Sequence, residues 1–144
     1  MNSSDHWETI KAHDFTEIAP CDIMAEADKA VVEYFKPENM AYINIANKIS
    51  IDCDCDSNLA EPEMNDIGIF ASIDPVTLDQ CCYDTIINSN DQGKDSLINR
   101  MKEKHAIYTI ETAYELGIGN REYELIDITS KLSKYDRLKF VILF

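Results

Sequence analysis

The sequence predicts one α/β domain over residues 1–144, a three-layer or two-layer sandwich around a mixed, mostly parallel sheet of about four strands. Three observations lead to this prediction. The chain has 144 residues, a common size for a domain with a single hydrophobic core. Its apolar fraction of 45% is typical of globular proteins. Apolar segments of strand length alternate with segments of helical periodicity, an order that favours parallel strands.

The first helix is expected between Pro20 and Pro37. Proline fits the first turn of a helix, and further along it ends one. Four apolar residues recur at spacings of four and three, which places them on one helix face: Ile23, Ala27, Val31 and Tyr34. Residues 1–15, before the helix, are polar and are expected to form a loose arm.

Two strands separated by a loop are predicted next. The segment Met40–Ile45 is short and apolar, and Ile67–Ser72 is a compact apolar run, typical of a strand covered on both faces. Residues 52–66 between them are acidic and contain Pro62, so they are predicted to form a long loop.

The middle of the chain predicts two helices. Asp74 can cap a helix whose first turn holds Pro75 and which runs to about Ile87. A longer helix is expected over Leu97–Leu116, with Gly117 as its stop. One stripe of this longer helix holds four residues: Met101, His105, Tyr108 and Thr112.

The last segments predict two more strands. Arg121–Ile128 shows partial alternation of apolar and polar residues. Phe140–Phe144 is entirely apolar and is expected to be a strand or a docking tail. Residues 129–144 are interpreted as a C-terminal tail of the same domain.

The charge of the chain limits its partners. It has 27 acidic and 13 basic residues, a net charge of −14. Such a field repels nucleic-acid phosphates and anionic membranes, so neither is expected to bind. No apolar run approaches the roughly 18 residues of a membrane-spanning helix. The five cysteines are odd in number and closely spaced, and no signal-peptide pattern is present, so a reducing cytoplasm is expected.

Three stretches carry a resemblance to a known family: Asp-Cys-Asp-Cys at 52–55, DIGIFASIDPVTLDQ at 66–80 and GIGNREYEL at 117–125. On these residues the chain resembles the C-terminal part of the domain of unknown function 362 family, whose members are often associated with iron–sulfur clusters. With the first helix included, the resemblance covers most of residues 14–128, and the tail from Thr129 lies outside it.

The resemblance implies a larger N-terminal α/β portion and a ferredoxin-like insert, and this chain carries neither. It has no Cys-x-x-Cys, and hence no motif for a [4Fe–4S] cluster. The resemblance therefore does not imply that this chain transfers electrons. We expect a natural short form or half of a split protein.

Cys53 and Cys55 are the candidate metal ligands. In an extended segment alternate side chains share a face, so both thiols would point the same way. Two thiolates are half of a tetrahedral zinc or iron site. The remaining ligands would come from Cys81, Cys82, His105, an aspartate or a second chain. The carboxylates that flank the two cysteines disfavour the thiolate form unless a cation is present. Two alternatives to a metal site therefore stay open: a pair of buried, inert thiols and a redox disulfide.

Three further residues are candidate functional residues: Asp74, Asp79 and Arg121. Asp74 is expected first of all as a helix cap. Asp79 lies one turn on, near the C-terminal end of a predicted parallel strand, where open α/β sheets place ligands. Arg121 is one of few cations in an acidic chain, and it is expected to pair with a carboxylate, with anion binding as the alternative.

Other chemistry-bearing residues are expected to be structural. Cys81 and Cys82 should pack as small hydrophobic residues, and His105 should be a partly buried histidine. Gly117 and Gly119 follow a helix and precede a strand, the reverse of a phosphate loop, so they are interpreted as a helix stop and turn.

No G-x-S-x-G and no H-E-x-x-H occurs in the chain. The sequence therefore favours a non-catalytic accessory or partner domain, working with a second chain that supplies the missing half, or as a homodimer. Two alternatives stay open: a metal-binding enzyme or redox protein that uses Cys53 and Cys55, and a structural remnant without its own chemistry. A sheet cut from a larger lobe should leave an apolar face, which residues 140–144 would help to cover.

Overall fold

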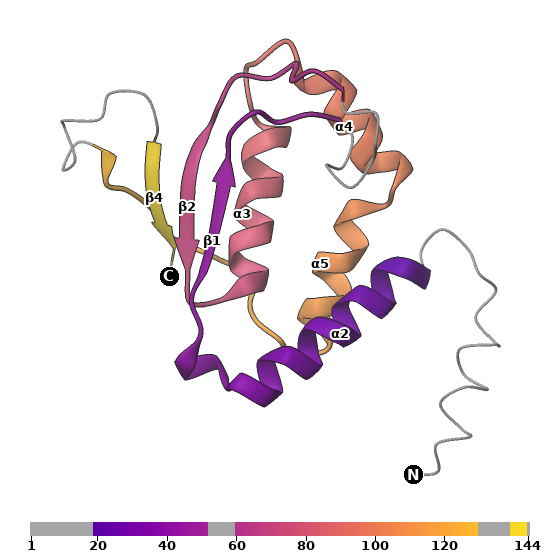
Figure 1. The fold of residues 1–144 in the computed structure, drawn as a ribbon, viewed down its shortest axis with the longest axis vertical. Helices are drawn as coiled ribbons and strands as arrows, with labels where there is room; N and C mark the ends of the chain where they lie inside the picture. Colours follow the sequence, from indigo (N-terminus) through magenta and orange to yellow (C-terminus); the bar gives the residue numbers. More distant parts are fainter. Residues whose placement is uncertain (1–18, 52–59, 130–138, 144) are drawn as a thin grey trace.

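The computed structural model describes residues 19–51, 60–129 and 139–143. It contains the mixture of helices and strands that the sequence predicts (Figure 1). The elements in chain order are α2 (Ala19–Phe35), the 3-10 helix η1 (Pro37–Asn39), β1 (Tyr42–Ala46), β2 (Gly68–Ser72), α3 (Pro75–Ile87), α4 (Lys94–Glu103), α5 (Ala106–Glu115), β3 (Leu125–Asp127) and β4 (Lys139–Leu143). No helix in these ranges is long and apolar enough to cross a membrane.

The strands form one sheet in the order β1-β2-β4-β3. The expectation of a mostly parallel sheet is wrong, because β1–β2 and β3–β4 are antiparallel and β2–β4 alone among the described pairings is parallel. The connections are compatible with this arrangement. A parallel pair needs a long crossover, and the three helices α3, α4 and α5 supply one between β2 and β4. The described residues between β1 and β2 form no helix, and these strands run in opposite directions.

One face of the sheet is covered by α3, which contacts β1 and β2 (Figure 1). Phe70 of β2 packs there with Leu78 and Cys81 of α3, and all three are buried. On the other face Ile43 and Ile45 of β1 are each 65% exposed. The expectation that the second strand is covered on both faces is therefore wrong. Its buried residues alternate with half-buried ones, as in a strand with one covered side.

Helix α2 packs against α5 through a narrow face (Figure 1). Between Asp22 and Phe35, where the burial of α2 is described, the buried residues are Ala25 and Val32. The inner side of α2 is also held by two polar contacts to α5 and its C-terminal end. Asp22 Oδ1 accepts a hydrogen bond from Thr112 Oγ1 at 2.7 Å, and Lys29 Nζ donates to the carbonyl of Leu116 at 3.0 Å.

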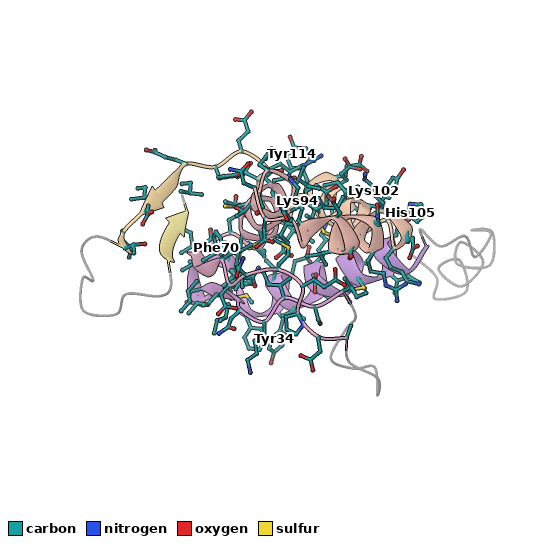
Figure 2. The ribbon with its side chains drawn as sticks, turned by 90° about the horizontal axis from the view of Figure 1, so that it is seen from above. Tyr34, Phe70, Lys94, Lys102, His105 and Tyr114 are labelled. Atoms are coloured by element: carbon teal, nitrogen blue, oxygen red, sulfur yellow. The ribbon has the colours of Figure 1, made fainter. Side chains whose placement is uncertain are left out.

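These contacts turn the apolar stripe of α2 outward. Ile23 is 49% exposed, Val31 48% and Tyr34 79%. The three residues lie on one helix face as predicted, yet that face is not the one that packs on α5. Figure 2 shows Tyr34 at the outer edge of the molecule.

The long helix predicted over Leu97–Leu116 is wrong in one respect, because it is divided into α4 and α5 at His105. His105 has a left-handed backbone (φ 51°), which interrupts the helical hydrogen-bond ladder. The break lets α5 change direction and reach both α2 and α3.

The helix ends follow the sequence more closely. Asp74 caps α3 by accepting a hydrogen bond from Thr77 N, as predicted. Gly117 has φ 74° after α5, and its N–H donates to the carbonyl of Tyr114. The N–H of Ile118 donates to the carbonyl of Ala113, which completes a Schellman motif. The glycine stop is confirmed.

The strand predicted over Arg121–Ile128 is reduced to β3, because Asn120, Arg121 and Tyr123 form hydrogen bonds with α3 just before it. Thr77 Oγ1 donates to the carbonyl of Asn120 at 2.8 Å, and Tyr123 OH donates to Asp84 Oδ2 at 2.9 Å. Residues 1–15, predicted as an arm, lie outside the described residues, and so do residues 130–138 of the predicted tail.

Candidate functional site

A cleft of about 850 Å³ opens where β2 ends and α3 begins. Its position at the C-terminal end of a strand is one where α/β sheets commonly bind ligands. The polar residues that line it come from β2, α3, α5 and the loop before β3: Ser72, Asp74, Thr77, Tyr114, Asn120, Arg121 and Glu122. The structure thus brings together two of the three predicted residues, Asp74 and Arg121.

Both oxygens of Asp74 are already engaged within the chain. Oδ1 accepts from Thr77 N at 3.0 Å, and Oδ2 accepts from Asn120 N at 2.8 Å. Gly119 lies so close to this carboxylate that a Cβ atom at that position would overlap with it. Asp74 therefore connects the start of α3 to the loop that follows α5, which is a structural role.

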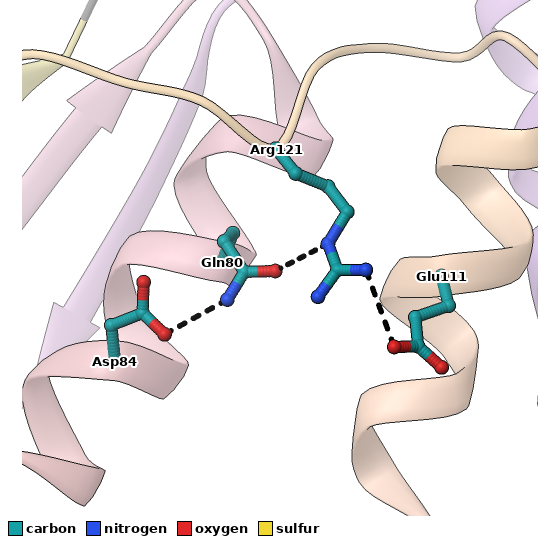
Figure 3. A network of polar contacts seen from close by, with 4 residues as sticks. All are labelled: Gln80, Asp84, Glu111 and Arg121. Atoms are coloured by element: carbon teal, nitrogen blue, oxygen red, sulfur yellow. Dashed lines mark hydrogen bonds and ion pairs between the residues drawn. The ribbon is translucent and has the colours of Figure 1, made fainter.

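Arg121 is paired, as the sequence predicts (Figure 3). Its Nε donates to Gln80 Oε1 at 2.8 Å, and a terminal nitrogen lies 3.2 Å from Glu111 Oε1. Gln80 in turn donates to Asp84 Oδ1 at 2.9 Å. This chain of contacts runs from α5 through Arg121 to α3. The guanidinium positive charge is therefore shared with Glu111 and is a poor candidate for binding an anion.

A second hollow, a groove of about 420 Å³, lies between α2, β1 and α3. Asp79, the third predicted residue, lines this groove and not the cleft at Asp74. Its Oδ1 accepts a hydrogen bond from Asn44 Nδ2 at 3.0 Å. Asp28 of α2 and Tyr42 of β1 line the same groove. Four polar side chains from three elements therefore meet here.

The groove is electrostatically negative. Burial raises the pKa of Asp79, and the charge of Asp28 raises it further, against the lowering effect of the Asn44 hydrogen bond. Burial also raises the pKa of Tyr42, with Asp74 and Asp28 adding to the effect. The phenol therefore stays protonated at neutral pH. Desolvation, the largest cause of both shifts, disfavours any charge, whereas the carboxylates of Asp28 and Asp79 would attract a cation.

The two adjacent cysteines of α3 pack as predicted. Cys81 is fully buried in the core with Phe70 and Leu78. Cys82 is half-buried and lies 3.5 Å from Asn44 Nδ2. Burial raises the pKa of Cys82 to about 11 and also raises that of Cys81. Both side chains are thiols at neutral pH, not nucleophilic thiolates.

The metal prediction remains open. Cys53 and Cys55 lie outside the described residues. Within the part of the chain that the structure describes, no group of three or more His, Cys, Asp or Glu side chains is placed to hold a metal ion. His105 is half-buried and meets the ring of Tyr108 edge to face, with ring centres 5.7 Å apart. A zinc or iron site at Cys53 and Cys55 stays a prediction.

Sequence reasoning missed three residues of the groove: Asp28, Tyr42 and Asn44. One signal was present for the two on β1. In YINIA, the residues Tyr42 and Asn44 alternate with isoleucines and so share a face. Asp28 offered no comparable signal, since a charged residue on a helix is usually solvated.

Comparison with known protein families gives one finding. The model of the family described as Domain of unknown function (DUF362) matches residues 6–84, more than half of the chain. The match includes Cys53, Cys55 and both groove carboxylates, and it ends within α3. The stretch at 117–125, which contributes to the resemblance seen in the sequence, lies beyond it. No curated protein and no solved structure matches.

Proposed function

Because this chain belongs to the DUF362 family, for which the match supplies no activity, we propose a function from its surface: a non-catalytic accessory domain that binds a second protein chain. The observation that carries this proposal is the outer face of the sheet. Ile43 and Ile45 of β1 each remain 65% exposed there. A half-covered sheet normally presents polar residues to water, so exposed isoleucines at alternate positions favour a further protein layer.

The strand register pairs both isoleucines with apolar residues of β2. Ile43 pairs with Ala71, and Ile45 pairs with Ile69. On the other side of β2, the Cα partners of Ile69 and Ala71 are Phe140 and Ile142 of β4. The C-terminal strand therefore widens the sheet. It pairs edge to edge with β2 and does not lie across the exposed isoleucines.

The polar clusters support a non-catalytic role. In the cleft beside α3, Asp74 and Arg121 bind other parts of the same chain. Cys81 is buried and Cys82 half-buried, and both thiols are protonated at neutral pH. These paired side chains and protonated thiols lack the activation that a catalytic acid, base or nucleophile needs.

The charge of the chain favours a different protein over a second copy. Two copies would each bring a net charge of −14 to the interface. A less acidic or basic partner would be attracted by the same field. A homodimer is thus the disfavoured alternative.

The test is native affinity capture with three versions of the tagged protein: wild type, Ile45→Ser and Tyr108→Ser. Ile45 belongs to the sheet face, whereas Tyr108 is an exposed residue of α5 that serves as the control. We expect a stoichiometric partner with wild type and with Tyr108→Ser, and its loss with Ile45→Ser. An equal yield with all three versions would contradict the proposal.

Light scattering after size exclusion decides between the two kinds of partner. The mass of one chain at micromolar concentration is expected. The mass of two chains, reduced to one by Ile45→Ser, would replace the accessory role with a homodimer.

A further inference from the structure

We propose that the groove between α2, β1 and α3 binds a partner segment in which an arginine or lysine lies beside apolar residues. This inference deepens the proposed function and rests on it, because it names the chemistry of the protein that the domain binds.

Apolar residues form part of the wall of the groove. Val31 of α2 lines one side and is 48% exposed. Met40 and Ala41, just before β1, and the buried Leu78 of α3 also line the groove. Ile43 of β1 contributes to the lining as well, although its side chain lies on the outer face of the sheet. A volume of about 420 Å³ is within the usual range for ligand pockets, and it is enough for a few side chains.

The apolar surface continues from the groove along α2. Four more large apolar residues of this helix are about half exposed or more: Ile23, Met24, Tyr34 and Phe35. They recur at helical spacing with Val31, so they form one stripe. The polar contacts of Asp22 and Lys29 fix the opposite side of α2 on α5, which leaves this stripe without a covering element among the described residues.

The polar lining of the groove is acidic. Asp28 of α2 and Asp79 of α3 both line it, and among the described residues no lysine, arginine or histidine does. One oxygen of Asp79 accepts from Asn44. Asp79 is exposed, and partial desolvation raises its pKa, so its carboxylate is less than fully solvated. A cation from a partner would offset that cost, while the apolar walls would hold its aliphatic stem.

Other occupants fit less well. A hard metal ion such as Ca²⁺ takes about six to eight oxygen ligands, more than two carboxylates and an amide supply. A second copy of this chain would bring another surface with a net charge of −14. A polypeptide with basic and apolar residues could contact the apolar lining of the groove and pair with the carboxylates of Asp28 and Asp79.

The test uses a synthetic amphipathic helix of leucine and lysine, and the same helix with glutamate in place of lysine. We expect wild type to bind the lysine peptide in fluorescence anisotropy, more weakly as salt rises, and not to bind the glutamate peptide. Asp28→Asn and Asp79→Asn should each weaken binding by about threefold, the size of a partly exposed ion pair. The matched control is Asp95→Asn, which removes the same charge from the first turn of α4.

Equal weakening by Asp79→Asn and Asp95→Asn would overturn the inference, because it would show attraction by net charge alone. Ile45→Ser separates this result from the proposed function, since Ile45 does not line the groove. If peptide binding depends on Asp79 while Ile45→Ser leaves native capture unchanged, the inference about the groove is supported and the proposed binding through the sheet face is contradicted. A concentration-dependent mass of two chains that Asp28→Asn abolishes would make a second copy the occupant and overturn the basic partner.

Discussion

Asp74 and Asn120 are joined by a 2.8 Å hydrogen bond from the backbone N–H of Asn120 to Asp74 Oδ2. The same carboxylate caps α3 through Thr77 N. A single side chain therefore holds the start of one helix and the loop that leaves another. Because Arg121 follows in the same loop, its ion pair with Glu111 depends on where Asp74 holds the backbone.

Replacing Asp74 tests this double contact. Loss of a helix cap alone costs about 1 kcal/mol of unfolding free energy. Asp74→Ala also leaves the N–H of Asn120 without its acceptor, so we expect a loss of about 2 kcal/mol. Asp74→Asn keeps one acceptor and should cost less. Urea unfolding followed by circular dichroism measures both, and equal stability of Asp74→Ala and wild type would contradict the double role.

Substitution of Gly117 and of Gly119 should lower the free energy of unfolding for two different reasons. Gly119→Ala places a methyl group against the Asp74 carboxylate, and overpacking of this kind costs about 1–3 kcal/mol. Gly117→Ala meets nothing within 4 Å, but its φ of 74° costs about 1–2 kcal/mol in alanine.

The two glycine variants are separated by combining each with Asp74→Ala. The penalty of Gly119→Ala should shrink in that background, because the atoms it overlaps are gone. The penalty of Gly117→Ala should stay the same. Two equal, unchanged penalties would show that Gly119 is not limited by Asp74.

The free energy of unfolding should depend on pH in part through the ionisation of Asp79. Burial raises the folded-state pKa of Asp79 above 3.8, its ordinary value. Between 3.8 and the raised pKa, the folded state binds more protons than the unfolded state, so this group lowers stability as pH rises through the window. Asp28 of α2, Tyr42 of β1 and Cys82 of α3 surround it, and Asp28 adds to the cost.

Asp79→Asn removes that cost and keeps an oxygen for Asn44. We expect the variant to be more stable than wild type at neutral pH by up to about 0.5 kcal/mol, the usual limit for an exposed site. The advantage should disappear as pH falls towards 3.8. Urea midpoints across a pH series measure it. An advantage that does not change with pH would mean that the charge of Asp79 is not its source.

Cys53 and Cys55 remain the predicted zinc or iron ligands. We expect about one metal ion per chain after anaerobic purification, and its loss in the double variant Cys53→Ser, Cys55→Ser. Cys21→Ser, which removes a thiol from a different segment, is the control. Elemental analysis with thiol titration measures both. Metal that survives in the double variant, or that is absent from wild type, would count against the site.

The local parts of the fold were the most predictable from sequence. The Asp74 cap and the Gly117 stop each depend on a few adjacent residues, and the buried cysteines depend on a helical pattern. The break at His105 was not predictable, because a histidine in left-handed backbone leaves no mark in the apolar stripe around it. The direction of β1 relative to β2 was equally unpredictable, because the long connection between them permits parallel or antiparallel pairing.

The candidate site shows the same division. Asp74 and Asp79 are close in sequence, but five residues of helix turn a side chain by about 140°. They therefore line different hollows. On α2, periodicity gave the correct apolar stripe, and it could not tell whether that stripe faces α5. The polar contacts from Thr112 and Leu116 decide this, and they come from residues about ninety positions away.

The strand order has a consequence for synthesis of the chain. Because β4 lies between β2 and β3, β3 has no neighbour in the sheet until Lys139–Leu143 has been made. Before that point α3 can pack on β1 and β2, and α5 can pack on α2 and α3. The sheet is completed only by the parallel pairing of β2 with β4, which closes a loop through most of the second half of the chain and is therefore slow. A chain that ends before Lys139 would therefore leave β2 with a bare edge, open to pairing with another such chain.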